Sequence, residues 1–443
     1  MQTITGVLPV QKMKSNNKSA LPNSTNGLRQ YSGPSLLQQI VPFVAILLLL
    51  GFASACSEEG IVGSGLDNPS VLVDTSIVQL TSITEVSDNG FSGRLPSSAM
   101  GKVNDPTYGT IEAAALLRPS IATDLISTFN QFSDMKLRLV FERNQYGDTT
   151  SVSSFNIYEI DELWRGNQIR VGETVAMNTS QLLGSFEVSP GQETAEVELD
   201  ESWVQRYREF FMDTSDDRIQ NYRDNFPGLA IVPDGDNNRL HFLRHLGTGS
   251  DGSGTGEVTA FVAENPDTTI TGDLQMLDFA SSIQRINEPE PENDSFVLHN
   301  TLERLLKINL DLAQERFQGV NISNAQLLLF VNDGVDSDLP NTFVRPLPNT
   351  IRVHLFNRDP LNVHADIFVQ QPTVTGVLNA ENNFYQLNFT NILIARLFTD
   401  NQPDLYLSVQ NQDGLLYSTT FFNENAPFDK TPKLIVTTVN ADN

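Results

Sequence analysis

Lys136-Leu-Arg-Leu-Val-Phe-Glu142 decides the fold class, because its apolar residues recur at every second position. Leu137, Leu139 and Phe141 therefore fall on one face of an extended chain, and the charged residues fall on the other. Strands with one buried and one solvated face are typical of antiparallel sheets. We expect a strand of such a sheet at this position.

The same alternation recurs along most of the chain, with Asn, Asp, Gly and Pro between the segments as turn residues. It is found in Ala195–Leu199, Leu306–Leu312, Ile351–Leu355, Tyr385–Phe389 and Leu405–Val409. The pattern predicts an all-β fold made of antiparallel strands.

Two segments instead have helical spacing. Ser202–Phe211 places Trp203, Tyr207, Phe210 and Phe211 on one helical face, with Asp200 or Ser202 as its N-terminal cap. Thr390–Phe398 predicts a second short helix directly after a strand. We interpret the aromatic stripe of the first helix as core, with a ligand platform as the alternative.

The order of strands and helix in the first half of the chain is repeated in the second half. This repeat predicts tandem antiparallel β-sandwiches, jelly-roll-like, with one short helix inserted in each. The predicted domains cover residues 71–275 and 276–443. An acidic, proline-containing stretch, Asn287–Ser295, resembles a linker close to this boundary.

Two family resemblances accompany this pattern. Arg304–Leu310, Ile322–Leu329, Leu387–Asn391 and Pro432–Val436 resemble DNRLRE-type β-sandwich domains, which are related to carbohydrate-binding modules. The resemblance covers residues 296–438 and, more faintly, 110–263, although the motif that names the family is absent. Gly101–Gly109 followed by Ala113–Leu117 resembles a Bacteroidetes lipoprotein family, that of the domain of unknown function 4270. Neither resemblance implies a catalytic residue.

The N-terminal segment resembles an export signal. The first 55 residues contain basic residues and no acidic one, and the apolar run Val41–Leu50 is followed by the small-residue stretch Gly51–Ala55. Such a run is short for a membrane-spanning helix, which is the alternative reading. Residues 1–55 are therefore predicted to be a signal peptide, with Met13 as an alternative start to Met1.

Cys56 is the only cysteine of the chain, and it follows the predicted cleavage point. Its surroundings resemble the lipobox of bacterial lipoproteins, which implies acylation of Cys56 and attachment to a lipid bilayer; a small buried hydrophobic residue is the alternative. Ser57, Glu58 and Glu59 are similar to the signal that exports Bacteroidetes lipoproteins to the cell surface, with an ordinary acidic tether as the alternative. Residues 56–70 are the predicted lipidated tether, and the predicted location is the outer membrane, facing the cell exterior.

Charge limits the partners of the mature chain. Removing the signal leaves 24 basic and 54 acidic residues, a formal charge of −30. Nucleic acids and anionic membrane surfaces are bound by basic patches, so this charge excludes nucleic acid as a partner. We expect a glycan or an envelope protein instead.

No catalytic motif stands out. The spacing of His241 and His245 suits a metal pair on a helix, but their segment is predicted to be a strand, in which four residues span about 13 Å. His354 is expected on the solvent side of its strand. Gly252–Gly256 lacks the strand-turn-helix context of a nucleophilic serine.

Two acidic loops carry oxygen ligands of the kind that calcium prefers. One loop holds Asp234 and Asp236, and the other holds Asp333, Asp336 and Asp338. Asp-Gly is also an ordinary turn sequence, so turns are the alternative. We expect no cofactor, with structural calcium in these loops as the alternative.

The predicted function is a non-catalytic, lipid-anchored binding module for a glycan or a partner protein. Tyr158 and Trp164 are the candidate ligand-binding aromatics, with core packing as the alternative for both. A structural or assembly lipoprotein of the cell envelope is the second hypothesis. A polysaccharide-degrading enzyme, which would use a pair of carboxylates, is the third; the acidic residues are so many that no particular pair is indicated.

Overall fold

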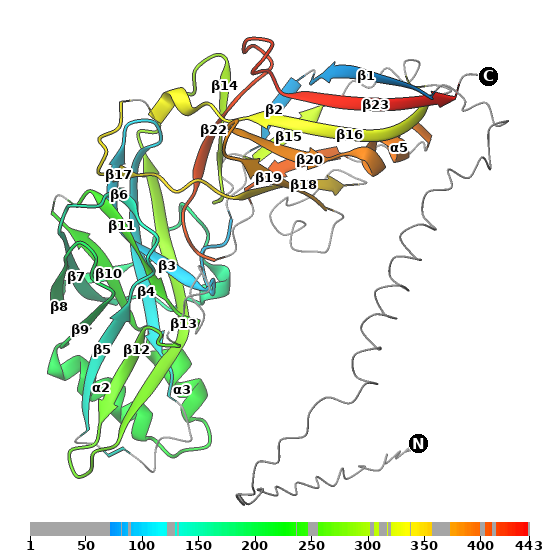
Figure 1. The fold of residues 1–443 in the computed structure, drawn as a ribbon. Coiled ribbons are helices and arrows are strands. Elements are labelled where there is room, and N and C mark those ends of the chain that lie inside the picture. The colour runs from blue at the N-terminus through cyan, green and yellow to red at the C-terminus, as the bar shows by residue number, and fades with distance from the viewer. Residues whose placement is uncertain are drawn as a thin grey trace, which may run out of the picture. The chain divides into compact units, whose positions relative to one another are not determined.

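Antiparallel β-sheet makes up most of the chain, as predicted (Figure 1). The structure is a computed structural model. It describes residues 71–80, 82–86, 90–121, 129–130, 133–235, 237–246, 256–301, 305–309, 317, 320–336, 338–356, 373–398, 404–409 and 413–441.

The larger sheet in the described part of the chain has 12 strands, and most of them come from the first half of the sequence. Three strands branch from β4: β10 pairs with β4 and β7, and β7 pairs with β8. The main path runs β17 (Phe343–Val344), β6 (Tyr146–Asp148), β11 (Arg239–Arg244), β3 (Ser97–Asp105), β4 (Gly109–Pro119), β13 (Thr271–Ile286), β12 (Ala260–Glu264), β5 (Asp134–Val140) and β9 (Thr194–Val197); the branch is β10 (Leu229–Asp234), β7 (Ser153–Ile160) and β8 (Met177–Val188).

A second sheet has nine strands among the described residues. Its order is β1 (Val71–Gln79), β23 (Lys433–Ala441), β16 (Asn321–Phe330), β20 (Phe384–Asn388), β19 (Thr373–Asn379), β18 (Thr350–Phe356), β21 (Asp404–Ser408), β15 (Leu305–Asn309) and β2 (Ser82–Val86). The two edge strands, β1 and β2, are consecutive in the chain, so the sheet curls on itself and encloses its inner side chains. A separate pair consists of β14 (Ser295–His299) and β22 (Ser418–Phe422).

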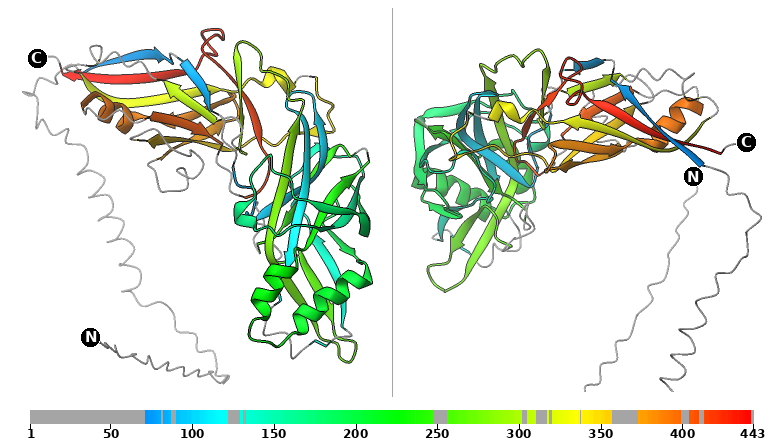
Figure 2. Two further views of the ribbon diagram at one scale, coloured as in Figure 1. Left: turned by 180° about the vertical axis from the view of Figure 1, so that it is seen from behind. Right: turned by 45° about the horizontal axis from the view of Figure 1, so that its top comes forward.

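The helices pack their aromatic or aliphatic side chains against the sheets. Helix α2 (Glu201–Met212) has Asp200 as its N-terminal cap, whose side chain accepts hydrogen bonds from the backbone N–H groups of Ser202 and Trp203. This confirms the predicted helix and one of its two predicted caps. Helix α3 (Arg218–Asn225) lies with α2 at one end of the 12-stranded sheet (Figure 2). The sequence does not predict α3, because only Ile219 and Tyr222 in it are apolar or aromatic. Helix α5 (Thr390–Phe398) matches the predicted second helix.

Buried apolar side chains form two large clusters, which lie along the two large sheets. Trp203, Tyr207 and Phe211 are fully buried in a cluster that α2, α3 and the 12-stranded sheet share. The aromatic stripe of α2 is therefore core, as predicted. A second cluster fills the nine-stranded sheet, and it also contains Val103, Tyr146 and Phe242 from the 12-stranded sheet. The two sheets thus share one apolar cluster.

The predicted domain boundaries differ from the strand pairing. The boundary between residues 275 and 276 falls inside β13, whose residues pair with β12 and β4. Strands β1 and β2 pair with β23 and β15, so residues 71–86 belong to the sheet of the second half. Strand pairing depends on hydrogen bonds between distant segments, and hydropathy along the sequence carries no information on them.

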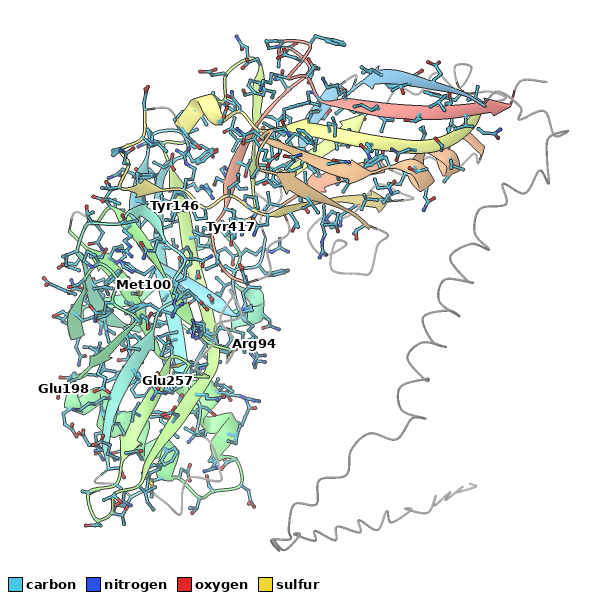
Figure 3. All side chains as sticks on the ribbon, viewed as in Figure 1. Arg94, Met100, Tyr146, Glu198, Glu257 and Tyr417 are labelled. Atoms are coloured by element: carbon cyan, nitrogen blue, oxygen red, sulfur yellow. The ribbon has the colours of Figure 1, made fainter. Side chains whose placement is uncertain are left out.

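A buried ion pair also connects the two halves of the sequence. Asp105, at the end of β3, accepts hydrogen bonds from Arg345 Nη2 at 2.7 Å and Arg345 Nε at 2.9 Å. Tyr146 Oη donates to the same carboxylate at 2.8 Å, and the guanidinium lies 4.5 Å from the centre of the Tyr108 ring. Figure 3 labels Tyr146 within this region. Burial, followed by the charge of Asp105, raises the pKa of Tyr146 well above its usual value, so its hydroxyl remains a donor.

Candidate functional site

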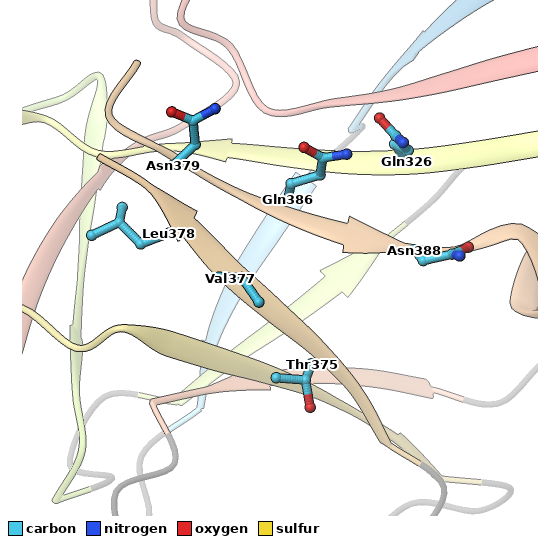
Figure 4. A pocket seen from close by; sticks show the side chains of 7 residues that line it. All are labelled: Gln326, Thr375, Val377, Leu378, Asn379, Gln386 and Asn388. Carbon is cyan, nitrogen blue, oxygen red and sulfur yellow. The ribbon is translucent and has the colours of Figure 1, made fainter. Parts of the chain in front are cut away.

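A hollow on the outer face of the nine-stranded sheet is the candidate site. It has a volume of about 600 Å³ and lies over β16, β20 and β19 (Figure 4). Its side chains are amides, one hydroxyl and two aliphatic groups: Gln326, Thr375, Val377, Leu378, Asn379, Gln386 and Asn388. None of these lining residues is charged, in a chain of net charge −26.

Strand register brings the amides together. Gln326 lies directly opposite Asn388 across the β16–β20 ladder, and Gln386 lies opposite Val377 across the β20–β19 ladder. Cross-strand partners point to the same face of a sheet, so these side chains share the outer face. The residues between them, Leu327 and Leu387, are fully buried in the core.

Gly376 allows β19 to lie close to the core beneath the hollow. A Cβ atom at this position would come within 2.7 Å of Leu387 Cγ and 3.0 Å of Ile351 Cγ1. The contact with Leu387 is shorter than Cβ atoms show and the contact with Ile351 is tight, so a larger residue would push the core side chains of Leu387 and Ile351 or the strand itself.

The amides of the hollow are largely free to bind a ligand. Among the described residues, Gln326 and Gln386 have no side-chain hydrogen bond, and Asn388 uses only its Oδ1, which accepts from the Thr390 backbone N–H at 3.1 Å. Asn379 Oδ1 is occupied by Asn382. Exposed amides with free donors and acceptors can form hydrogen bonds with a polar ligand.

Aromatic and cationic groups lie at the margins of the hollow. Phe330 and Phe384 pair in the next register row, half-buried, with ring centres 5.6 Å apart. Lys433 Nζ lies 4.9 Å from the centre of the Phe330 ring and donates to the Phe428 and Asp429 carbonyl oxygens at 3.3 and 3.1 Å. Arg352 lies opposite Thr375 on the other side.

The candidate aromatics from the sequence lie elsewhere. Trp164 is only 4% exposed, and its Nε1 donates to the Pro227 carbonyl oxygen at 2.7 Å. Trp164 is therefore a core residue, the alternative that the sequence left open, and it does not serve as a ligand-binding aromatic. Tyr158 is half-buried on β7 opposite Ala230 and Leu182, outside the hollow.

The acidic loops have protein partners. Asp234 is exposed at the end of β10, while Asp236 lies outside the described residues. Asp333 accepts from Asn383 Nδ2 at 2.6 Å, Asp336 pairs with Arg345, and Asp338 is exposed. No group of three or more His, Cys, Asp or Glu residues in the described part of the chain is arranged to hold a metal ion. Structural calcium stays a prediction.

Each of the four histidines in the described residues is buried and hydrogen-bonded to a serine. His241 bonds to Ser153, His245 to Ser98, His299 to Ser418 and His354 to Ser408, at 2.7–3.0 Å. The prediction of a solvent-facing His354 is wrong, since this side chain is fully buried. Burial lowers the pKa of His241 and of His245 to about 3.

These buried histidines predict a loss of stability in mild acid. His241 and His245 stay neutral in the folded protein, whereas in the unfolded chain each binds a proton below its ordinary pKa of about 6.5. Their contribution is therefore present above pH ~6.5 and is lost as the pH falls towards 3. From about pH 7 to pH 5, we expect the free energy of unfolding to fall by about 2 kcal/mol for each of His241 and His245.

Urea titrations at both pH values will measure this loss. His241→Asn should remove about half of the two-histidine contribution, relative to the wild type measured in the same buffers. An unchanged pH dependence in this variant would contradict the assignment of the effect to His241.

The predicted anchor lies outside the described residues. This holds for Cys56 and for Ser57, Glu58 and Glu59. In the described part of the chain, no helix combines the length and the apolar character needed to cross a membrane.

The residues of the hollow were missed because the sequence separates them by about 60 positions. The available signal was the composition of the outward-facing positions: Gln326 in one strand and Gln386 and Asn388 in another are polar but uncharged. In so acidic a chain, neighbouring uncharged polar positions on a solvent face are a usable indication of a binding surface.

Comparison with known proteins adds little to this geometry. The chain matches no protein-family model and no curated protein. Among solved structures, it is similar to a candidate secreted protein from Parabacteroides distasonis, at 9% sequence identity over 84% of this chain and 100% of that chain. The TM-score of 0.18 is too low to support an inference about fold or function.

Proposed function

We propose that this chain is a lipid-anchored, non-catalytic binding module of the outer membrane that holds a glycan at the hollow on β16, β20 and β19. The observation that carries the binding proposal is a group of amide side chains on neighbouring strands, of which Gln326 (half-buried) and Gln386 (exposed) make no side-chain hydrogen bond within the described residues. The resemblance of residues 296–438 to carbohydrate-binding sandwiches supports the same ligand class. The resemblance of residues 41–59 to a lipoprotein export signal supports the location.

The binding proposal is tested with the purified mature chain. We expect it to retain one or more polysaccharides on a glycan array, to bind them in isothermal titration calorimetry, and to release no reducing ends. Turnover that is lost on substitution of one carboxylate would replace the binding module with an enzyme. No detectable binding on the array, and none in calorimetry with soluble polysaccharides, would overturn the glycan proposal.

The anchor makes a separate prediction. Cys56→Ser should remove all acyl chains and move the protein from the membrane fraction to the soluble fraction, because stable anchoring needs more than one chain. Mass spectrometry of the N-terminal peptide and detergent phase partitioning measure both effects. As a matched control, the triple alanine variant of Ser57, Glu58 and Glu59 should keep its lipid and lose access to protease added to intact cells. A membrane-bound Cys56→Ser protein would contradict the anchor.

A structural role in an envelope complex is the second candidate, and one edge strand favours it. Strand β1 is nine residues long and lies at an edge of the nine-stranded sheet among the described strands, with Val73 64% exposed. Long edge strands with exposed aliphatic groups are sites where partner strands pair. Recovery of a stable partner crosslinked to residues 71–79 in intact outer membranes would support this candidate.

A further inference from the structure

The hollow has the chemistry of an uncharged ligand. We propose that it binds a neutral, hydroxyl-rich glycan laid across the strands, through hydrogen bonds to Gln326, Gln386 and Asn388. This inference rests on the proposed function and specifies its ligand class.

Hydrogen-bonding capacity is the first argument. A primary amide carries two N–H donors and a carbonyl acceptor, and a hydroxyl group both donates and accepts. A glycan hydroxyl can therefore satisfy either end of Gln326 or Gln386. A carboxylate or sulfate group only accepts, so it can pair with the amide N–H groups but not with the amide oxygens.

Charge is the second argument. The seven lining residues include neither a cation to pair with an acidic sugar nor a carboxylate to bind an amino sugar. The nearest cations in register are Lys433 and Arg352. The ammonium of Lys433 already donates to two backbone carbonyl oxygens. Arg352 lies on β18, one strand beyond Thr375.

The apolar groups of the hollow also fit a sugar. Val377 is 59% exposed among the amides, and Leu378 is half-buried beside it. A sugar ring presents C–H groups as well as hydroxyls, so an aliphatic surface between amides is complementary to it. The half-buried rings of Phe330 and Phe384 extend this apolar surface at one margin.

The register gives the direction of the ligand. Gln326, Asn388 and Thr375 form one row across β16, β20 and β19. Asn388 and Thr375 occupy facing positions, because Gly376 pairs with Leu387 and the two strands run antiparallel. Neighbouring strands lie about 4.8 Å apart, so polar groups repeat at that spacing across the sheet. An extended chain that crosses the strands meets one polar group on each.

Calorimetry with neutral and acidic polysaccharides tests the inference. We expect a neutral polysaccharide to bind the wild type with an affinity that does not change between low and high salt, because no charge pair is formed. The Gln326→Ala/Gln386→Ala variant should bind it about tenfold more weakly, or worse, since two hydrogen bonds are lost. Gln275→Ala, which removes an exposed amide from β13, is the matched control and should keep the wild-type affinity.

The outcomes separate this inference from the proposed function. Salt-sensitive binding of acidic polysaccharides only, weakened by Arg352→Gln, would overturn the neutral ligand and leave the binding module standing. Neutral binding that the double variant does not weaken would overturn the site. The absence of any glycan binding would overturn both proposals. Circular dichroism of each variant establishes that its fold is intact.

Discussion

Asp105→Ala is expected to destabilise the folded protein by about 3–5 kcal/mol, the cost of removing one partner from a buried ion pair. The carboxylate is completely buried, and the side chain of Arg345 is 5% exposed. Besides Arg345 and Tyr146, the backbone N–H groups of Thr107 and Tyr108 donate to Asp105 at 2.8 and 2.9 Å. The substitution leaves the guanidinium of Arg345 charged and buried, without the Asp105 carboxylate as its partner.

Two further variants make the test specific. Asp336→Asn removes the other carboxylate that pairs with Arg345, but Asp336 is half exposed. Its loss should cost about 1 kcal/mol or less. Asp105→Leu combined with Arg345→Met should recover only the part of the loss that comes from the unpaired guanidinium, because Tyr146 and the backbone N–H groups of Thr107 and Tyr108 still lose their acceptor.

Urea unfolding of the four proteins gives these free energies. If Asp105→Ala costs no more than Asp336→Asn, the buried pair is not what stabilises the contact between the β3 end and the segment after β17. Increased hydrogen exchange at residues 343–345 in Asp105→Ala would locate the loss.

Trp203→Ala is expected to lower the free energy of unfolding by about 3–5 kcal/mol, as for other buried aromatic residues replaced by alanine. The ring is fully buried and has Tyr207, Phe226 and Phe261 as neighbours, with ring centres 5.0–6.2 Å apart. So large a cavity among rigid rings cannot close by small movements of its neighbours.

Trp203→Phe separates volume from polarity. Within the described residues, Nε1 of Trp203 has no hydrogen-bond partner, so the smaller ring also removes an unsatisfied donor. We expect Trp203→Phe to cost less than half of what Trp203→Ala costs. Glu209→Ala, on the exposed side of α2, should change stability by no more than about 0.5 kcal/mol. Equal losses for the two Trp203 variants would contradict the cavity argument.

The amide hollow could not be predicted from the sequence, and neither could its strand β19, although the strand at Tyr385–Phe389 was predicted. The alternation in Tyr385–Phe389 correctly placed Gln386 and Asn388 outward and Leu387 inward. It could not show that Gln326, some 60 residues earlier, lies opposite Asn388. The same limit applies to Trp164, because nothing in the sequence indicates that the Pro227 carbonyl oxygen accepts a hydrogen bond from its ring nitrogen.

What the sequence determined by itself is local. Apolar residues at every second position predicted the strands. The spacing of Trp203, Tyr207 and Phe211 predicted a helix, and Asp200 predicted its N-terminal cap. Tertiary structure alone decided that residues 71–86 join the sheet of the second half, that His354 is buried, and that three amides share one face. The physical reason is that the alternation of apolar and polar residues indicates which face of a strand is buried. The neighbour of each strand is chosen by backbone hydrogen bonds and shared burial between segments far apart in the chain.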